Sequence, residues 1–323
     1  MGLAGYIVRR SIYTVVLIYL VLTLNFILFV AMPGDPVAIL ASSLRLRPDQ
    51  VEKVVKLFGL DQPIHIRYFK YLQSMFTFNF GYSYYYGGRP VAELIMERLP
   101  NTILLLGSAT VFAIIAGVII GAVAAYRRGG KFDVTAITAS LLTTALPTFW
   151  MGMIFLLIFG VYLHWFPLAG AMSRPPPTEF WSQIADRLWH LFLPGLTLFL
   201  FFYGSFALLT RSAVLETLTE DYILTAKAKG LDDRKILFKH ALRNALLPLV
   251  TTAAIWLASV IGGAIITEQI FTYEGMGYLI WMAVARYDYP VLQATFYILA
   301  LAVIIANFIA DIIYGFIDPR IKY

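Results

Sequence analysis

The amino-acid sequence predicts an all-α polytopic membrane protein that crosses the bilayer with about six transmembrane helices. Hydrophobic residues make up 60% of the 323 residues and only 14% are charged, whereas a typical soluble domain has about 25% charged residues. A soluble core of this size cannot bury so many apolar side chains. Several apolar stretches also reach the length of roughly 20 residues that a helix needs to span the hydrocarbon layer.

Six apolar stretches are long enough to cross. They cover residues 11–32, 101–126, 135–163, 188–210, 246–266 and 291–316. The third contains Pro147 but is too short for two crossings, so we expect one tilted or kinked helix. The first is longer than the apolar region of a signal peptide and lacks a small-x-small cleavage site, so we expect it to be retained.

Basic residues gather on one side of the predicted bundle. They lie at the N-terminus, in the turn after the second span, in the segment 211–247 and at the C-terminus. Since short cytoplasmic loops carry an excess of Lys and Arg, we expect a multi-pass protein of the cytoplasmic membrane with both termini in the cytoplasm. The predicted domains are the N-terminus with the first helix (1–32), an extracytoplasmic segment (33–99), and a five-helix core (100–323) that includes the cytoplasmic loop 211–247.

Residue patterns for catalysis or cofactor binding are missing from the sequence. There is no cysteine, and the four histidines are scattered without the spacing of metal ligands. Gly129-Gly130-Lys131 is followed by Phe132, so it does not form a phosphate-binding loop. The net charge of +6 follows from the membrane topology and needs no nucleic acid as a partner. We expect no catalytic residue, metal or cofactor in this chain.

Ionisable residues are rare inside the predicted spans. Asp311, near the cytoplasmic end of the last span, is the clear exception, and a carboxylate in the membrane costs about 2.5–3.5 kcal/mol unless it has a partner or a use. Stand-alone channels and secondary carriers depend on such groups, so their scarcity disfavours both classes. An intramembrane enzyme is disfavoured as well, because the chain shows no nucleophile–base pair.

Gly117 and Gly121 form a GxxxG pair, and Ala113 and Ala125 continue the same helix face. Small residues at this spacing allow two helix backbones to approach closely. The partner is either another helix of this chain, which is the commoner case, or a helix of a second membrane subunit.

The segment after the fourth span has the local signals of a short helix, a sharp turn and a second helix. Asp221 is placed to cap a helix over 222–229, and Gly230 is placed to end it in the left-handed conformation. Asp232 is placed to start the second helix, where its charge suits the helix dipole. The sequence therefore predicts a folded element on the cytoplasmic side.

The surface of this element suits a contact. Ala226 and Ala228 leave a slim contact surface, and Lys227 and Lys229 carry positive charge. Those lysines can meet carboxylates of a soluble partner protein. They can equally lie against anionic lipid headgroups, as basic helices near a membrane commonly do.

Two stretches of this segment carry a family resemblance. They read Thr225-Ala226-Lys227-Ala228-Lys229-Gly230-Leu231 and His240-Ala241-Leu242-Arg243-Asn244-Ala245-Leu246-Leu247-Pro248. Both resemble the ATPase-coupling motif of permease subunits in ATP-binding-cassette (ABC) importers, in the form of the dipeptide/oligopeptide permease family and its first permease subunit type. The resemblance implies the type I ABC-importer permease fold. It also implies a coupling role for Thr225, Ala226, Lys227, Ala228, Lys229, Gly230 and Leu231.

Further motifs extend the resemblance over nearly the whole chain. They are Pro33-Gly34-Asp35-Pro36, Gly81-Tyr82-Ser83, Glu268-Gln269-Ile270-Phe271, Gly275-Met276-Gly277, Asp288-Tyr289-Pro290 and Asp318-Pro319-Arg320-Ile321. The resemblance implies an outer mouth that contacts a binding protein, formed by Asp35, Tyr82, Tyr84, Glu268, Gly275 and Gly277. Asn79 and Glu274 depart from the family, in which Asp and Pro are common at those places. The tyrosines also suit an interfacial aromatic belt, which is the commoner use.

The resemblance implies a permease subunit of an ATP-driven ABC importer. Its partners would be a homologous second permease subunit, two ATP-binding-cassette ATPase subunits that bind ATP and Mg²⁺, an extracytoplasmic substrate-binding protein and the lipid bilayer. Relatives in this family carry dipeptides, oligopeptides, nickel complexes or oligosaccharides. We expect peptides, with oligosaccharides such as cello-oligosaccharides as the alternative.

Overall fold

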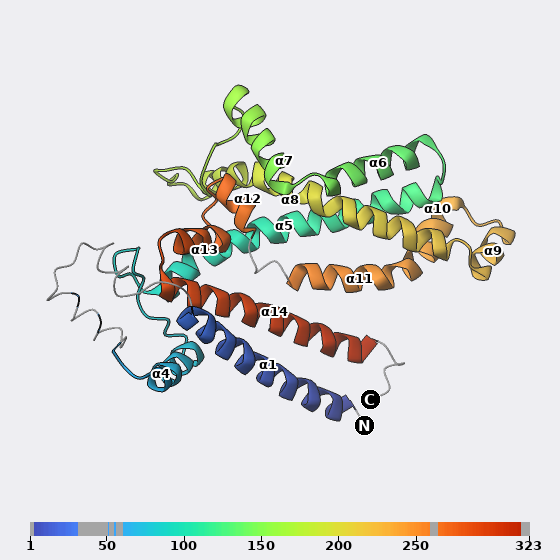
Figure 1. The fold of residues 1–323 in the computed structure, drawn as a ribbon. Helices are drawn as coiled ribbons and strands as arrows, with labels where there is room; N and C mark the ends of the chain where they lie inside the picture. Colours follow the sequence, from blue (N-terminus) through green and yellow to red (C-terminus); the bar gives the residue numbers. More distant parts are fainter. Residues whose placement is uncertain (1–2, 32–50, 52–54, 56–60, 259–263, 318–323) are drawn as a thin grey trace. The chain divides into compact units, whose positions relative to one another are not determined.

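The computed structural model describes residues 3–31, 51, 55, 61–258 and 264–317. Within this part of the chain the regular structure is helical, apart from an isolated β-bridge between Tyr82 and Pro90 (Figure 1). The all-helical fold predicted from the sequence is confirmed. The chain divides into two compact units, which we call unit 1 (Met1–Pro100 with Met276–Tyr323) and unit 2 (Asn101–Gly275).

Unit 1 is built on a long helix pair. Its helices are α1 (Leu3–Ala31), α4 (Ile64–Phe76), α13 (Met276–Ala285) and α14 (Tyr289–Ile317). α1 and α14 pack side by side (Figure 1). They run antiparallel, because Arg10 contacts Asp311 whereas Asn25 contacts Gln293. The start of α1 and the end of α14 therefore lie at the same end of unit 1, as an even number of crossings requires.

Asp311 has a charged partner on α1. Arg10 Nη1 lies 2.9 Å from Asp311 Oδ2, and Tyr6 Oη donates a hydrogen bond of 3.2 Å to the backbone oxygen of Asp311. A carboxylate at membrane depth persists when it is paired. The ion pair therefore accounts for the presence of Asp311 in an otherwise apolar helix by joining α14 to α1.

Asn25 is a buried polar residue in the last third of α1. Its Nδ2 donates to Tyr71 Oη on α4 and to the backbone oxygen of Gln293 on α14, both at 3.0 Å. Thr23 Oγ1 and Tyr68 Oη are 2.7 Å apart and add a second link between α1 and α4. Since polar groups inside a membrane protein need internal partners, these bonds fix α4 against the helix pair.

Unit 2 is arranged around one very long helix. Its elements are α5 (Val91–Tyr126, from Asn101 onwards), α6 (Lys131–Ala145), α7 (Thr148–Phe155), α8 (Phe180–Thr217), α11 (Leu242–Ala258) and α12 (Ile265–Ile270). The 38-residue α8 packs against α6, α7, α11 and α12. It also runs past the predicted span 188–210 and into the segment that we had assigned to the cytoplasmic loop.

Glycines bring the long helices of unit 2 into close contact. A Cβ atom on Gly117 of α5 would lie 2.6 Å from Phe206 Cβ on α8, and one on Gly204 of α8 would lie 2.7 Å from Thr143 Oγ1 on α6. Only a hydrogen atom fits at these positions. The close approach predicted from the GxxxG pair is confirmed, and the partner is a helix of the same chain.

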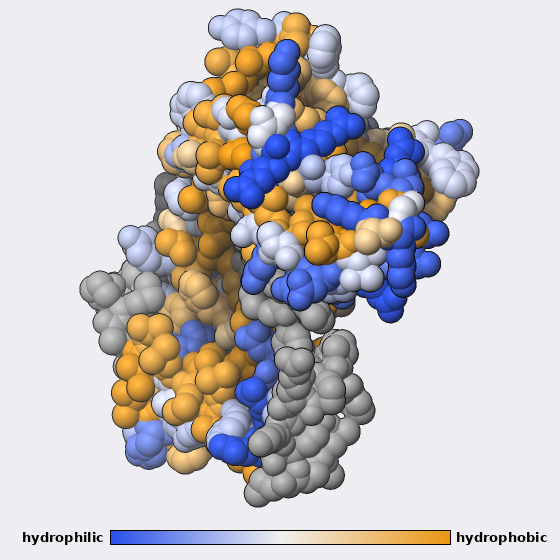
Figure 2. Space-filling model, turned by 90° about the vertical axis from the view of Figure 1, so that its right-hand side faces the viewer, coloured by the Kyte–Doolittle hydropathy of each residue, from blue (hydrophilic) through white to orange (hydrophobic). Residues whose placement is uncertain are grey.

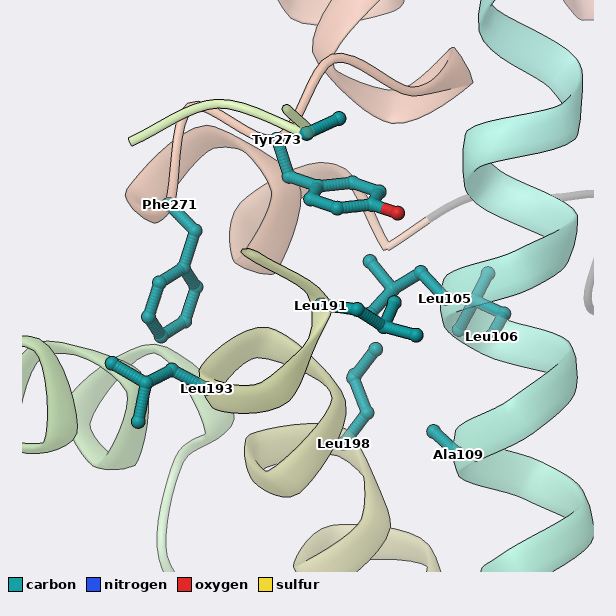
Figure 3. Close-up of a cluster of buried hydrophobic side chains, with 9 residues drawn as sticks. Leu105, Leu106, Ala109, Leu191, Leu193, Leu198, Phe271 and Tyr273 are labelled. Carbon is teal, nitrogen blue, oxygen red and sulfur yellow. The ribbon is translucent and has the colours of Figure 1, made fainter. Parts of the chain in front are cut away.

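An apolar cluster fills one end of unit 2 (Figure 3). Leu105 and Leu106 of α5 face Leu191 and Leu198 of α8. The segment after α12 adds two buried aromatic residues, Phe271 and Tyr273. This buried cluster holds α12 and the segment after it against α5 and α8. We call α12 and this segment the outer hairpin.

The third apolar stretch is broken at Pro147. Lys131–Ala145 and Thr148–Tyr162 are bent by 98° at the break, which is the geometry of a broken span or a re-entrant loop. Pro147 has no N–H to donate, and its ring holds Leu146 in an extended conformation with φ −77° and ψ 131°. The expected kink is therefore present, but it is far sharper than a tilt of one continuous helix.

Four described helices are long and apolar enough to cross a membrane, and the count is five if the bent pair forms one span. The four are Gly5–Phe29, Val91–Tyr126, Phe180–Thr217 and Tyr289–Ile309. They correspond to the first, second, fourth and last predicted spans. Of the remaining span, 246–266, α11 covers the part up to Ala258, and residues 259–263 lie outside the described residues.

Candidate coupling element and outer face

The cytoplasmic loop predicted from the sequence is a compact helical element at the end of α8. It consists of α9 (Asp221–Ala228), α10 (Asp233–Lys235) and a π-helical turn, Ile236–Ala241, that leads into α11. Asp232 caps α10, because its carboxylate accepts a 3.1 Å hydrogen bond from the backbone N–H of Arg234. Asp221 does not cap α9. It is the first residue of that helix, and Glu220 occupies the N-cap position.

Gly230 ends α9 in the predicted left-handed conformation, with φ +70°. The backbone N–H of Gly230 donates to Lys227 O at 2.9 Å, and that of Leu231 donates to Ala226 O at 3.3 Å. This pair of bonds defines a Schellman motif, which satisfies the last carbonyl groups of the helix. A β-carbon on Gly230 would have no atom within 4 Å, so the backbone conformation alone favours glycine there.

One face of α9 is anchored on the rest of unit 2. Ile223 and Ala226 are buried in a cluster with Ala122 of α5, Val214 of α8 and Ile236. Leu231 packs against the same cluster. Ala226, which we had placed on the contact surface, therefore supports that surface from below, while Ala228 is exposed.

The opposite face of α9 is exposed. Leu224 is 70% exposed, and Thr225, Lys227 and Lys229 are exposed around it. Asn244 Nδ2 on α11 donates a 2.6 Å hydrogen bond to Tyr222 Oη on α9. Figure 2 views this end of unit 2 and shows hydrophilic side chains gathered around smaller apolar patches. An exposed apolar side chain followed by two exposed lysines is a suitable anchor for an acidic protein surface.

An ion pair with a buried carboxylate joins α8 to α6. Arg211 of α8 donates two hydrogen bonds to Asp133 of α6, Nε to Oδ1 at 2.6 Å and Nη2 to Oδ2 at 2.9 Å. The backbone N–H of Gly129 donates to Asp133 Oδ2 at 2.9 Å. One carboxylate thus ties the turn between α5 and α6 to the helix that carries α9.

The outer-face candidates of unit 2 form a tight hairpin. Glu268 of α12 is fully buried and accepts a 2.9 Å hydrogen bond from Thr102 Oγ1 on α5. A Cβ atom on Gly275 would lie 2.7 Å from Glu268 Cδ. Glu274 pairs with Arg174, and its backbone oxygen accepts a 2.8 Å bond from Asn101 Nδ2. Glu268 and Gly275 are therefore packed inside the hairpin and hold it against α5.

The remaining outer-face candidates lie in unit 1 or outside the described residues. Tyr82 is exposed, Tyr84 is partly buried, and Gly277 is buried in α13. Burial, with a smaller contribution from the carboxylate of Asp288, raises the pKa of the Tyr84 phenol, so this side chain stays neutral at physiological pH. Asp35 lies outside the described residues.

Three buried polar residues have roles that the sequence did not predict. Asp133, Asn25 and the side chain of Asp288 make contacts with segments distant in the chain. The available signal was weak: Asp133 follows a Gly-Gly turn at a helix start, and Asp288 stands just before the last helix. Among the described residues, no group of three His, Asp or Glu could hold a metal ion.

The sequence matches family models of inner-membrane transport proteins along most of its length. Residues 117–323 match the family described as the binding-protein-dependent transport system inner membrane component, and residues 3–106 match the N-terminal region of such membrane components. The chain belongs to this family and is a multi-pass membrane permease of the ABC-importer type.

Proteins that are similar to this chain over nearly its full length are named as permease proteins of peptide transport systems. The chain is 39% identical over 321 residues to the oligopeptide transport system permease protein AppB of Bacillus subtilis, covering 99% of this chain and 100% of that protein. It is 34% identical over 333 residues to the di/tripeptide permease protein DppB of Pseudomonas aeruginosa, covering 99% of each. It is also 34% identical over 334 residues to the dipeptide permease protein DppB of Escherichia coli K12, covering 98% of each. The oligosaccharide alternative is not favoured by these relatives.

Proposed function

We propose that this chain forms part of the translocation pathway of an ABC importer for dipeptides or oligopeptides. The observation that carries the proposal is the similarity to peptide permeases, which extends over 98% or more of the chain. In this role the chain is not itself an enzyme. ATP and Mg²⁺ bind to partner ATPase subunits, and this chain contributes no catalytic residue and no cofactor.

The exposed face of α9 supports a docking role toward an ATPase subunit. Leu224 would enter an apolar groove of the partner while Lys227 and Lys229 meet carboxylates at its rim. Thr225, Ala228 and Gly230 complete the exposed element, and Ala226 and Leu231 hold it in place from the buried side. Closure of the ATPases would then move α9 together with the helices on which it is built.

The assembled transporter contains, in this proposal, a second homologous permease subunit, two ATPase subunits and an external binding protein. Both termini of this chain lie in the cytoplasm, which is the side that the basic residues favour. The opposite end of the α1–α14 pair then faces outward and belongs to the region that receives the binding protein. Glu268 and Gly275 would shape the outer hairpin, and Tyr82 and Tyr84 would belong to the receiving surface.

Purification of the tagged chain from gently solubilised membranes tests the proposal. We expect a second permease and ATPase subunits to co-purify, with ATP hydrolysis that is stimulated by the binding protein loaded with peptide. A lone chain without ATP turnover, from cells that express the partner subunits, would contradict the importer assignment. In liposomes, ATP-driven uptake of a labelled dipeptide that an excess of oligosaccharide does not inhibit would support the substrate class.

A further inference from the structure

A turn rich in tyrosine is held rigidly in unit 1. The carboxylate of Asp288 accepts hydrogen bonds from Ser83 Oγ and from the backbone N–H groups of Tyr84 and Tyr85, the latter two at 3.1 Å. Ser83 Oγ in turn accepts a 2.8 Å bond from the backbone N–H of Tyr86. Asp288 and Ser83 are both buried. One buried carboxylate therefore fixes the backbone of a turn some 205 positions away in the sequence.

The same contact brings an arginine against the turn. The Arg286 guanidinium lies 5.0 Å from the centre of the Tyr85 ring, in cation–π geometry. Arg286, Tyr85 and Tyr82 are all exposed. Tyr287, with φ +54°, is also half exposed and lies between Arg286 and the buried Asp288. The Tyr85 ring therefore supports an exposed Arg286 guanidinium at the surface of unit 1.

This surface lies at the end of unit 1 opposite the start of α1 and the end of α14. Asp288 immediately precedes α14, whereas Asp311, near the other end of α14, pairs with Arg10 at the start of α1. With the termini in the cytoplasm, as proposed above, the tyrosine turn faces outward. It can then contact an extracytoplasmic partner, and it lies on the side of the membrane away from the ATPase subunits.

We propose that Arg286 and Tyr85 form a recognition surface for a carboxylate on the external binding protein, and that Asp288 is the residue that positions it. The inference rests on the proposed function as an importer. A guanidinium stacked on an aromatic ring keeps its N–H edge available for a two-pronged bond to a carboxylate. Among the described residues, no carboxylate forms an ion pair with Arg286.

Preorganisation distinguishes this surface from an ordinary belt of interfacial tyrosines. Rings that only anchor a protein at the headgroup level need no fixed backbone. Here three hydrogen bonds to Asp288, and the further bond to Ser83, fix the turn before any partner arrives. A surface fixed in advance loses less conformational entropy when it binds. This favours a protein partner over a lipid headgroup.

The test uses the complete transporter in liposomes, with the purified binding protein as the probe. The concentration of binding protein that half-maximally stimulates ATP hydrolysis is compared for Arg286→Glu, Asp288→Asn and one control. The control, Arg89→Gln, removes another exposed cation from the same turn, where Arg89 pairs with Glu97. We expect Arg286→Glu to raise the half-maximal concentration about tenfold, with little change in the maximal rate.

Asp288→Asn should shift the half-maximal concentration in the same direction, because an amide cannot accept all three bonds. The control Arg89→Gln should stay within about twofold of the unchanged protein, and higher salt should weaken binding less in Arg286→Glu. An unchanged half-maximal concentration in Arg286→Glu would overturn the proposal, even if Asp288→Asn failed to fold. A shift that appears only with anionic lipids would also overturn it in favour of a headgroup site. Failure of the unchanged transporter to respond to any binding protein would instead refute the importer function.

Discussion

Asp133 and Arg211 form a two-pronged ion pair between α6 and α8, although they are 78 positions apart in the sequence. Asp133 is almost fully buried, and it also accepts the backbone N–H of Gly129. Three elements therefore converge on one carboxylate: the α5–α6 turn, the start of α6, and the helix that leads into α9. The pair therefore links the helix that leads into the coupling element to α6 and to the α5–α6 turn.

Replacing Asp133 by alanine should destabilise unit 2 strongly. The substitution leaves the Arg211 guanidinium without its buried partner and the Gly129 N–H without an acceptor. Because Arg211 is partly exposed to solvent, we expect a cost of about 1–3 kcal/mol, below that of a fully buried pair. We expect a clear fall in the midpoint of thermal unfolding in detergent. Lys131→Gln, which removes an exposed charge two positions away, should leave the midpoint unchanged. Equal midpoints for Asp133→Ala and the unchanged chain would show that the pair is not structural.

Gly117→Ala should be damaging, whereas Gly107→Ala should not. A Cβ on Gly117 would lie 3.0 Å from two backbone atoms of α8, Ala207 N and Tyr203 O, so the helices would have to separate. Overpacking of this kind costs about 1–3 kcal/mol. Gly107 lies on the same helix with no atom within 4 Å of its added Cβ, so alanine should be neutral or slightly stabilising there. Thermal unfolding of the two variants checks the difference, and similar midpoints would contradict it.

Sequence patterns predicted the helical elements, because a helix and its caps depend on residues that are close together in the chain. Span lengths, the left-handed Gly230 and the cap at Asp232 all follow from patterns within a few positions. The GxxxG pair predicted a close helix contact, but only the fold shows that its partner is α8. Sequence patterns predict the local conformation of a residue, but they do not identify the distant residues that it contacts.

The residues that the sequence did not predict are those whose partners are far away in the chain. Asp288 looks like a cap for α14, yet its carboxylate binds the turn at Ser83. Asn25 looks like an isolated polar residue in an apolar span, yet it joins α1 to α4 and α14. The sharpness of the bend at Pro147 was also missed, since proline forbids a helical hydrogen bond without fixing the angle between the two pieces.

Gly275→Ala should loosen the outer hairpin of unit 2. The added Cβ would press on the carboxylate of Glu268 and on Thr102 Oγ1, which share a hydrogen bond between α12 and α5. We expect a loss of stability of about 1–3 kcal/mol and greater proteolytic sensitivity of the hairpin. Gly195→Ala is the matched control, because its added Cβ would meet only Leu191 Cγ at 3.9 Å. If the hairpin of Gly275→Ala resisted proteolysis as well as that of Gly195→Ala, this role of Gly275 would be contradicted.

The exposed Leu224 should be required for energy coupling but not for folding. Its side chain makes little contact with the rest of the chain, so Leu224→Ser should leave thermal unfolding unchanged. If Leu224 enters a groove of an ATPase subunit, the same substitution should cost about tenfold or more in affinity for that subunit. The amount of ATPase subunit that co-purifies with each permease variant measures the effect. Leu224→Met should still bind most of the ATPase subunit, because methionine has a similar size and polarity. Full retention by Leu224→Ser would place the contact elsewhere on α9.

Gly230→Val should impair peptide uptake while leaving membrane insertion intact. The left-handed conformation at φ +70° costs a residue with a β-carbon about 1–2 kcal/mol, so valine would unwind the Schellman motif that ends α9. Gly129→Val is the control for backbone strain, because Gly129 has φ +77° and equally open surroundings but lies in the turn between α5 and α6, outside α9. If strain alone lowered uptake, both variants would be affected equally. We expect uptake to fall much further in Gly230→Val than in Gly129→Val, because only the former displaces the face that carries Leu224, and normal uptake by Gly230→Val would remove α9 from the coupling pathway.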